Sequence, residues 1–155
     1  MRIAVGADHA GFPLKALAVV QLQQLGHEVL DLGTDSEEPV DYPDFAQAVA
    51  EAVMRGEAER GLLLCGSGVG ASVAANKVPG VRAAVCHDSF SARQGVEDDD
   101  MNVLCLGARV VGPQLALDVI RAWDGAVFSG AERHTRRLNK VKAIEERYQR
   151  HDSSA

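Results

Sequence analysis

Short apolar segments alternate with longer amphipathic segments along most of this chain. The apolar segments are too short for helices and suit buried parallel strands; they span Arg2–Ala7, Glu28–Leu32, Leu62–Leu64, Val81–Cys86 and Asn102–Leu106. Between them, apolar residues recur every three or four positions, which predicts helices. The alternation therefore predicts an α/β fold, a doubly wound five-stranded parallel sheet with helices on both faces.

Proline and glycine mark where several of these helices begin and end. Pro13 suits a first helical turn and Gly26 a helix end. The face of that helix is predicted to carry Leu14, Leu17, Ala18, Leu22 and Leu25. Further helices are expected from Tyr42 to Gly56, over Ala71–Asn76, over Ser89–Val96, from Pro113 with a stripe that includes Leu115 and Trp123, and over Glu132–Arg150. Thr34–Asp41 is predicted to be a loop, and Glu97–Asp100 an acidic turn.

The length of the chain and the absence of a linker predict one domain. No internal repeat interrupts the 155 residues, which are enough for one sizeable core. We expect a single domain over residues 1–150 and a frayed tail over 151–155.

The stretch Gly61–Lys77, GLLLCGSGVGASVAANK, carries the clearest chemical signal. It reads as a strand, a tight glycine turn and a helix start, where backbone N–H groups can hold an anion and a thiolate is favoured. Cys65 would stand at the edge of that anion hole. A glycine-rich turn with a structural cysteine fits the pattern equally well. The spacing matches neither the dinucleotide, nor the nucleotide-phosphate, nor the serine-elbow motif.

Composition excludes several classes of partner. The net charge of −6 argues against nucleic acid and anionic membranes, and no apolar run has the length of a membrane span. The N-terminus lacks a signal-peptide core, and the three cysteines show no metal-ligand spacing. We therefore expect reduced thiols and a cytoplasmic location.

Polar side chains gather where the predicted strands end, the edge at which such sheets bind ligands. These residues are Asp8, His9, Cys65, Ser67, His87, Asp88 and Arg109. A solvated loop edge would also collect polar residues. On the last helix, Arg133 and Arg137 share a face and could clamp a phosphate, although a solvated basic face is the simpler interpretation.

Taken together, the motifs resemble one family over nearly the whole chain. The segments GADHAGFPLK, DLGT…DYPD, CGSGVGASVAANKVPGVRA, NVLCLGAR and RHTRR resemble the type B ribose-5-phosphate isomerase family, which includes the subunits of galactose-6-phosphate isomerase. The resemblance implies a Rossmann-like αβα fold and a homodimer or homotetramer, with the C-terminal helix reaching a partner subunit. It also implies aldose–ketose isomerisation of a phosphorylated sugar through a cis-enediol, with no cofactor and no metal.

The resemblance also assigns roles to residues of this chain. Cys65 matches the base that moves a proton between C2 and C1, and Ser67 matches a hydroxyl that helps at the substrate oxygens. Asp8 and His9 match residues that contact sugar hydroxyls or phosphate, with His9 also a candidate catalytic residue, and the amides of Gly66–Gly70 match the hole that holds the enediolate. The substrate-binding candidates are Asp8, Tyr42, Gly66, Gly68, Gly70, Asp99, Arg109, Arg133, His134 and Arg137. Arg109, Arg133 and Arg137 are expected to hold the phosphate across a subunit interface.

One position departs from the family pattern. Asp98 stands where the family usually has a histidine that helps to open the furanose ring. An ionised carboxylate can accept a proton but cannot donate one. Ring opening would then fall to Asp98 as a base, to His9 or to His134, or the substrate differs. Ribose 5-phosphate is the expected substrate, another phosphorylated aldose such as a hexose 6-phosphate is the alternative, and a non-catalytic sugar-phosphate-binding module is the rival class.

Overall fold

The computed structural model describes residues 1–149 and confirms the predicted alternation of strands and helices. The strands are β1 Arg2–Ala7, β2 Glu28–Asp31, β3 Arg60–Cys65, β4 Ala83–Val85 and β5 Val103–Gly107. The helices are α1 Phe12–Gln24, α2 Tyr42–Met54, α3 Val69–Ala75, α4 Ser89–Asp99, α5 Pro113–Asp124 and α6 Glu132–Gln149. No helix among residues 1–149 combines the length and apolar character needed to cross a bilayer.

The strands form one parallel sheet in the order β2-β1-β3-β5-β4. The register brings three carboxyl ends together, since Ala7 lies opposite Leu64 and Cys65 opposite Gly107. Loops that follow β1, β3 and β5 therefore share one edge of the sheet, where ligands bind in open α/β folds. This topology confirms the predicted doubly wound, Rossmann-like sheet.

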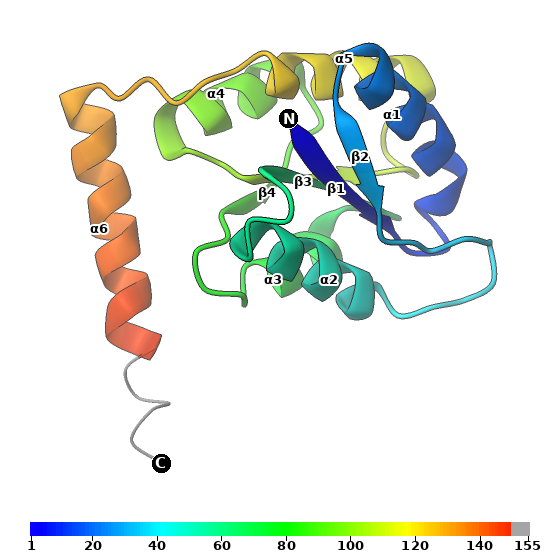
Figure 1. The fold of residues 1–155 in the computed structure, drawn as a ribbon, viewed down its shortest axis with the longest axis horizontal. Helices are drawn as coiled ribbons and strands as arrows, with labels where there is room; N and C mark the ends of the chain where they lie inside the picture. The colour runs from blue at the N-terminus through cyan, green and yellow to red at the C-terminus, as the bar shows by residue number, and fades with distance from the viewer. Residues whose placement is uncertain (150–155) are drawn as a thin grey trace.

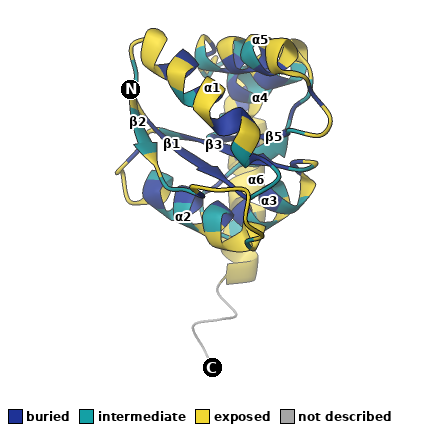
Figure 2. Cartoon of the chain, turned by 90° about the vertical axis from the view of Figure 1, so that its right-hand side faces the viewer, coloured by how far each residue is buried: buried dark blue, intermediate teal, exposed yellow. Residues whose placement is uncertain are grey.

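Alternate residues of the central strands pack on opposite faces of the sheet. Along β3, Leu62 and Leu64 join one apolar core, whereas Leu63 and Cys65 join the other. Helices α1, α4 and α5 cover the first face, and α2 and α3 cover the second (Figure 1). Exposed residues lie on the outer surfaces of these helices and in the connecting loops (Figure 2).

Helix α6 packs by its first half against the edge of this three-layer body. Figure 1 shows it beside α4, at the opposite side of the molecule from α1. Its buried residues are His134 and Leu138, while Val141, Ile144 and Tyr148 are exposed. The basic helix predicted from residue 132 is confirmed to residue 149; the expected last residue, Arg150, and the expected tail, 151–155, lie outside the described part of the chain.

Two sequence predictions about the helices were wrong. Glu97, Asp98 and Asp99 are not a turn, because α4 continues to Asp99 and ends only at Asp100, whose φ is +51°. The predicted apolar stripes were also too wide. Leu17 and Leu25 of the first helical segment and Leu115 of α5 are each more than a third exposed.

Candidate active site

Cys65 is the last residue of β3, and the turn that follows wraps around its sulfur. Gly68 adopts the left-handed conformation, with φ of +82°, and its N–H donates to Cys65 Sγ at 3.0 Å. The Val69 N–H donates to Ser67 Oγ at 3.2 Å. The thiol therefore has an amide donor against it, which is the polar environment that stabilises negative charge on sulfur.

Close backbone packing holds this turn against the neighbouring strand ends. Ala108 N–H donates to the carbonyl of Cys65 and Arg109 N–H to that of Gly66, at 2.8 and 3.0 Å. Gly107 lies so near Ser67 that a Cβ there would sit 2.6 Å from the Ser67 carbonyl carbon and oxygen. Only glycine allows that approach, so β5 fixes the position of Ser67.

The loop after β1 supplies the opposite wall of the site. Asp8 is buried, and its Oδ1 accepts the Gly11 N–H at 2.9 Å. His9 Nδ1 accepts the Val40 N–H at 3.1 Å. A ring nitrogen that accepts a hydrogen bond carries no proton, so His9 is neutral and holds its proton on Nε2.

A cavity of about 420 Å³ joins these loops. Its lining residues are Asp8, His9, Ala10, Tyr42, Cys65, Gly66, Ser67, Gly70, Arg109 and Val110. The Tyr42 ring lies against Gly70, and the Arg109 side chain passes beside Gly66. The cavity thus combines a thiol, a hydroxyl, a guanidinium and several backbone amides, which can hold an anion and handle protons beside it.

Within this one chain, the other predicted site residues form a separate group between α4 and α6. His134 is 7% exposed; its Nε2 lies 3.3 Å from Asp98 Oδ1 and its Nδ1 lies 2.6 Å from Ser129 Oγ. Gln94 Nε2 donates to the other Asp98 oxygen at 2.7 Å. Arg133 and Arg137 are exposed on the same helix as His134. None of these residues lines the Cys65 cavity.

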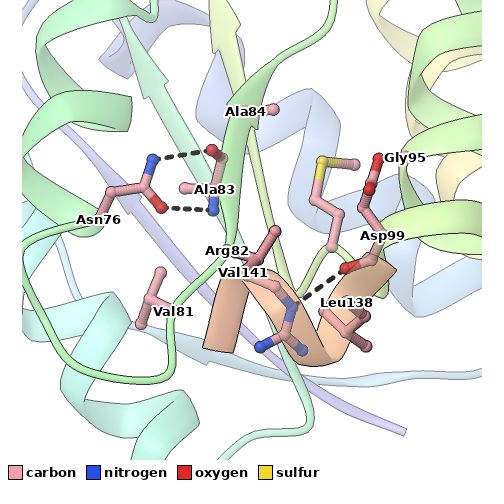
Figure 3. A pocket seen from close by; sticks show the side chains of 10 residues that line it. Asn76, Val81, Arg82, Ala83, Ala84, Gly95, Asp99, Leu138 and Val141 are labelled. Atoms are coloured by element: carbon pink, nitrogen blue, oxygen red, sulfur yellow. Dashed lines mark hydrogen bonds between the residues drawn. The ribbon is translucent and has the colours of Figure 1, made fainter. Parts of the chain in front are cut away.

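Asp99 lines a different hollow, of about 300 Å³, beneath α6 (Figure 3). Its walls are mostly apolar and include Val81, Leu138 and Val141. The backbone carbonyl of Asp99 accepts from Arg82 Nε at 3.1 Å. Asp99 therefore holds the end of α4 in this chain rather than facing the thiol.

The three cysteines differ in their surroundings. Burial raises the pKa of the Cys86 thiol to about 11, and the charge of Asp88 adds to this. Burial also raises the pKa of Cys105, whose side chain is fully enclosed in the sheet. Cys86 and Cys105 are therefore neutral packing residues, and Cys65 is the cysteine that lines the cavity.

Two polar residues predicted at the ligand-binding edge have structural tasks instead. His87 Nε2 accepts the Gly107 N–H at 2.9 Å, and the Asp88 carboxylate caps α4 by accepting the Ser91 N–H. That hydrogen bond lowers the pKa of Asp88.

The Gly68 amide was predicted to bind substrate, but its N–H donates to Cys65 Sγ instead. Sequence reasoning missed Ala10 and Val110, which are small or apolar residues without a chemical signature.

Comparison with known proteins identifies the family. The model of the Ribose/Galactose Isomerase family matches residues 3–141. This chain belongs to the ribose/galactose isomerase family. No group of His, Cys, Asp or Glu within residues 1–149 could hold a metal ion.

Individual members of the ribose/galactose isomerase family are similar to this chain over nearly its full length. Ribose-5-phosphate isomerase B of Escherichia coli K12 is 49% identical over 146 residues, which is 94% of this chain and 97% of that protein. D-erythrulose-4-phosphate isomerase of Pectobacterium atrosepticum is 46% identical over 84% of this chain and 86% of its own. The structure of Clostridium thermocellum ribose-5-phosphate isomerase B superimposes with a TM-score of 0.93 at 51% identity, covering 96% of this chain and 99% of that one.

Proposed function

We propose that this chain is a cytoplasmic sugar-phosphate isomerase that interconverts ribose 5-phosphate and ribulose 5-phosphate without a cofactor. The observation that carries the proposal is Cys65 at the end of β3. Its sulfur receives the Gly68 N–H and lines a cavity with Ser67 and Arg109. Membership of the ribose/galactose isomerase family supports the same reaction class.

The chemistry begins with proton abstraction beside a carbonyl. The Cys65 thiolate removes the proton from C2 of the open-chain aldose, the C2 electrons form a C1–C2 double bond, and negative charge develops on O1. Amides of the turn after β3 stabilise that oxyanion. Ser67 exchanges protons with O1 and O2, and the Cys65 thiol returns its proton to C1, which yields the ketose.

Phosphate binding orients the sugar for this step. Arg109 lies in the cavity, whereas Arg133 and Arg137 belong to α6, remote from Cys65 in this chain. We propose that α6 of a second copy brings these two arginines to the cavity in a homodimer or homotetramer. The exposed apolar residues Val141, Ile144 and Tyr148 of α6 support such an association. Binding energy from the phosphate then holds the reacting carbons against the thiol.

Replacement of the cavity thiol tests the proposal. We expect Cys65→Ala to reduce turnover of ribulose 5-phosphate by roughly 10²–10⁴-fold, the usual contribution of a general base, while sugar-phosphate binding persists. Turnover is measured by NMR and binding by calorimetry. The matched controls are Cys86→Ala and Cys105→Ala, which should lower stability more than rate because both thiols are buried packing residues.

Alternative functions give different results in the same assay. Turnover of a hexose 6-phosphate in preference to the pentose phosphates would indicate another aldose as the substrate. Binding of sugar phosphate without any turnover would indicate a non-catalytic binding module. Unchanged turnover in Cys65→Ala would remove the thiol from its proposed role.

A further inference from the structure

Among residues 1–149, the hydrogen bonds around the cavity leave no group placed to protonate a sugar ring oxygen. Opening a furanose breaks the bond between C1 and the ring oxygen. A base must take the proton from the O1 hydroxyl as C1=O1 forms, and an acid must deliver a proton to the departing ring oxygen. Imidazolium and protonated carboxyl groups are the usual acids for such a step.

His9 lines the cavity, but its tautomer excludes it as the acid that protonates the ring oxygen. Its Nδ1 accepts the Val40 N–H at 3.1 Å, so the ring cannot be an imidazolium while the loop 32–41 keeps this bond. The Nε2 proton of a neutral imidazole can be shared in a hydrogen bond but is not released at neutral pH. His9 can therefore orient a sugar hydroxyl but cannot act as the acid.

His134 and Asp98 pair with each other and with neighbouring side chains of their own chain. The two atoms His134 Nε2 and Asp98 Oδ1 lie 3.3 Å apart, and Ser129 Oγ lies 2.6 Å from His134 Nδ1. Gln94 holds the second oxygen of Asp98. Both nitrogens of the imidazole and both oxygens of the carboxylate thus have partners within the same chain. A second copy that keeps this fold carries the same pairs.

The other residues of the cavity do not replace them. Asp8 accepts the Gly11 N–H and, as a carboxylate, only accepts. Arg109 and Tyr42 bring a guanidinium and a phenol, side-chain types that are not used as proton donors of this kind at neutral pH. Among residues 1–149, the cavity therefore has a base and an oxyanion site but no ring-opening acid.

We infer that this site acts on open-chain sugar phosphates and has no ring-opening step. The inference rests on the proposed function and narrows its substrate class. Suitable substrates are those in which the hydroxyl needed to close a five-membered ring is esterified, as in 2-ketopentose 5-phosphates such as ribulose 5-phosphate and in tetrose 4-phosphates, or is absent, as in tetrulose 4-phosphates. D-erythrulose 4-phosphate, the sugar in the name of the Pectobacterium relative, is of this class. Ribose 5-phosphate keeps its O4 hydroxyl free, closes to a furanose, and would react only through its open form.

The test compares the flux from a cyclic substrate with the rate at which its ring opens by itself. The spontaneous opening rate of ribose 5-phosphate is first measured by saturation-transfer NMR without enzyme. Wild-type enzyme is then used at a concentration that consumes ribulose 5-phosphate several times faster than this rate. We expect conversion of ribose 5-phosphate to be capped at the spontaneous rate and to be unaffected by more enzyme, whereas conversion of ribulose 5-phosphate and D-erythrulose 4-phosphate stays proportional to enzyme.

The outcomes separate this inference from the proposed function. Conversion of ribose 5-phosphate faster than its ring opens spontaneously overturns the open-chain inference and leaves the isomerase proposal intact. Conversion of none of the three sugar phosphates overturns both, since no isomerisation then occurs. The inference is supported if only the conversion of ribose 5-phosphate is limited to the spontaneous ring-opening rate. Ribulose 5-phosphate carries the same phosphate and forms the same enediol, and it differs in having no ring to open.

Discussion

At the scale of single residues, the interaction between Asp98 and His134 decides which proton transfers are available. Asp98 also accepts from Gln94, so its carboxylate holds α4 against the first turns of α6. Replacing this carboxylate frees His134 Nε2 and can introduce a second proton donor. The residue at position 98 therefore determines whether this place in the molecule holds a structural contact or an acid–base group.

We predict that Asp98→His raises the conversion of ribose 5-phosphate relative to that of ribulose 5-phosphate. In the proposed dimer, position 98 lies beside α6 and would reach the cavity of the second copy together with Arg133 and Arg137. An imidazolium there can deliver the proton that the ring oxygen requires, so the ratio of the two rates should rise by roughly 10²-fold or more, as expected for a positioned acid. Stopped-time NMR of both substrates measures the ratio at equal enzyme concentration.

The control for the change in charge is Asp118→His, on the exposed surface of α5. It makes the same substitution away from the cavity and should leave the ratio where it is in the wild type. An unchanged ratio in Asp98→His would mean that a histidine at this position does not reach the substrate.

The sequence predicted the residues of the Cys65 cavity better than the group between α4 and α6. Cys65, Ser67 and Arg109 follow strands whose order along the chain is easily read, and parallel strand ends must meet at one edge. The contact between Asp98 and His134 was not foreseen, because it depends on the extra turn of α4 and on where α6 docks. Neither the tautomer of His9 nor the engagement of Gly68 with sulfur has a sequence signature, since both follow from backbone donors.

At the scale of elements, tertiary contacts set the boundary that the sequence misplaced. The three aspartates of the run Glu97–Asp100 have low helix propensity, and negative charge is unfavourable at the C-terminal end of a helix, so the run favours a turn. Arg82 reverses that outcome: its Nε donates to the carbonyls of Asp99 and Asp100 at 3.1 and 3.0 Å, and its guanidinium pairs with the Asp100 carboxylate at 3.2 Å. Arg82 lies directly before β4, so the sequence of α4 itself does not indicate that this residue caps the helix.

Gly107 links the sheet to the catalytic turn, and its substitution tests that link. A Cβ in Gly107→Ala would sit 2.6 Å from the Ser67 carbonyl, and the β3–β5 register leaves little room for either backbone to yield. We predict a loss of about 1–3 kcal/mol in the free energy of unfolding, together with reduced turnover from displacement of Ser67. Chemical denaturation and the ribulose 5-phosphate assay measure the two effects.

Gly125→Ala is the matched control, since this glycine ends α5 with φ of −74° and a Cβ there makes only ordinary contact with Arg121. We expect it to be neutral or slightly stabilising. Equal stability of the two variants would show that the backbone at Gly107 and Ser67 can move apart to admit a Cβ.

At the scale of the whole molecule, the separation of the two groups of polar residues allows a complementation test. We predict that Cys65→Ala and Arg133→Ala are each poorly active alone but recover activity when their subunits are mixed and exchanged. In a mixed dimer one of the two sites draws an intact thiol from one chain and an intact arginine from the other, so about a quarter of wild-type activity should return.

The readout is specific activity before and after denaturation and refolding of the mixture. Each variant refolded alone provides the baseline. Activity equal to the mean of the two baselines would mean that Arg133 serves the cavity of its own chain or none.

The position of β3 in the sheet also has a consequence for biosynthesis. β3 bonds to β1 on one side and to β5 on the other, and β5 ends only at Gly107. Both neighbours exist only after the whole segment from β1 to Gly107 has been synthesised, and parallel partners cannot be supplied earlier by a local hairpin. Until then the nascent chain carries Leu62, Leu63 and Leu64 on an unpaired edge, the kind of surface that chaperones bind and that aggregates when translation stalls.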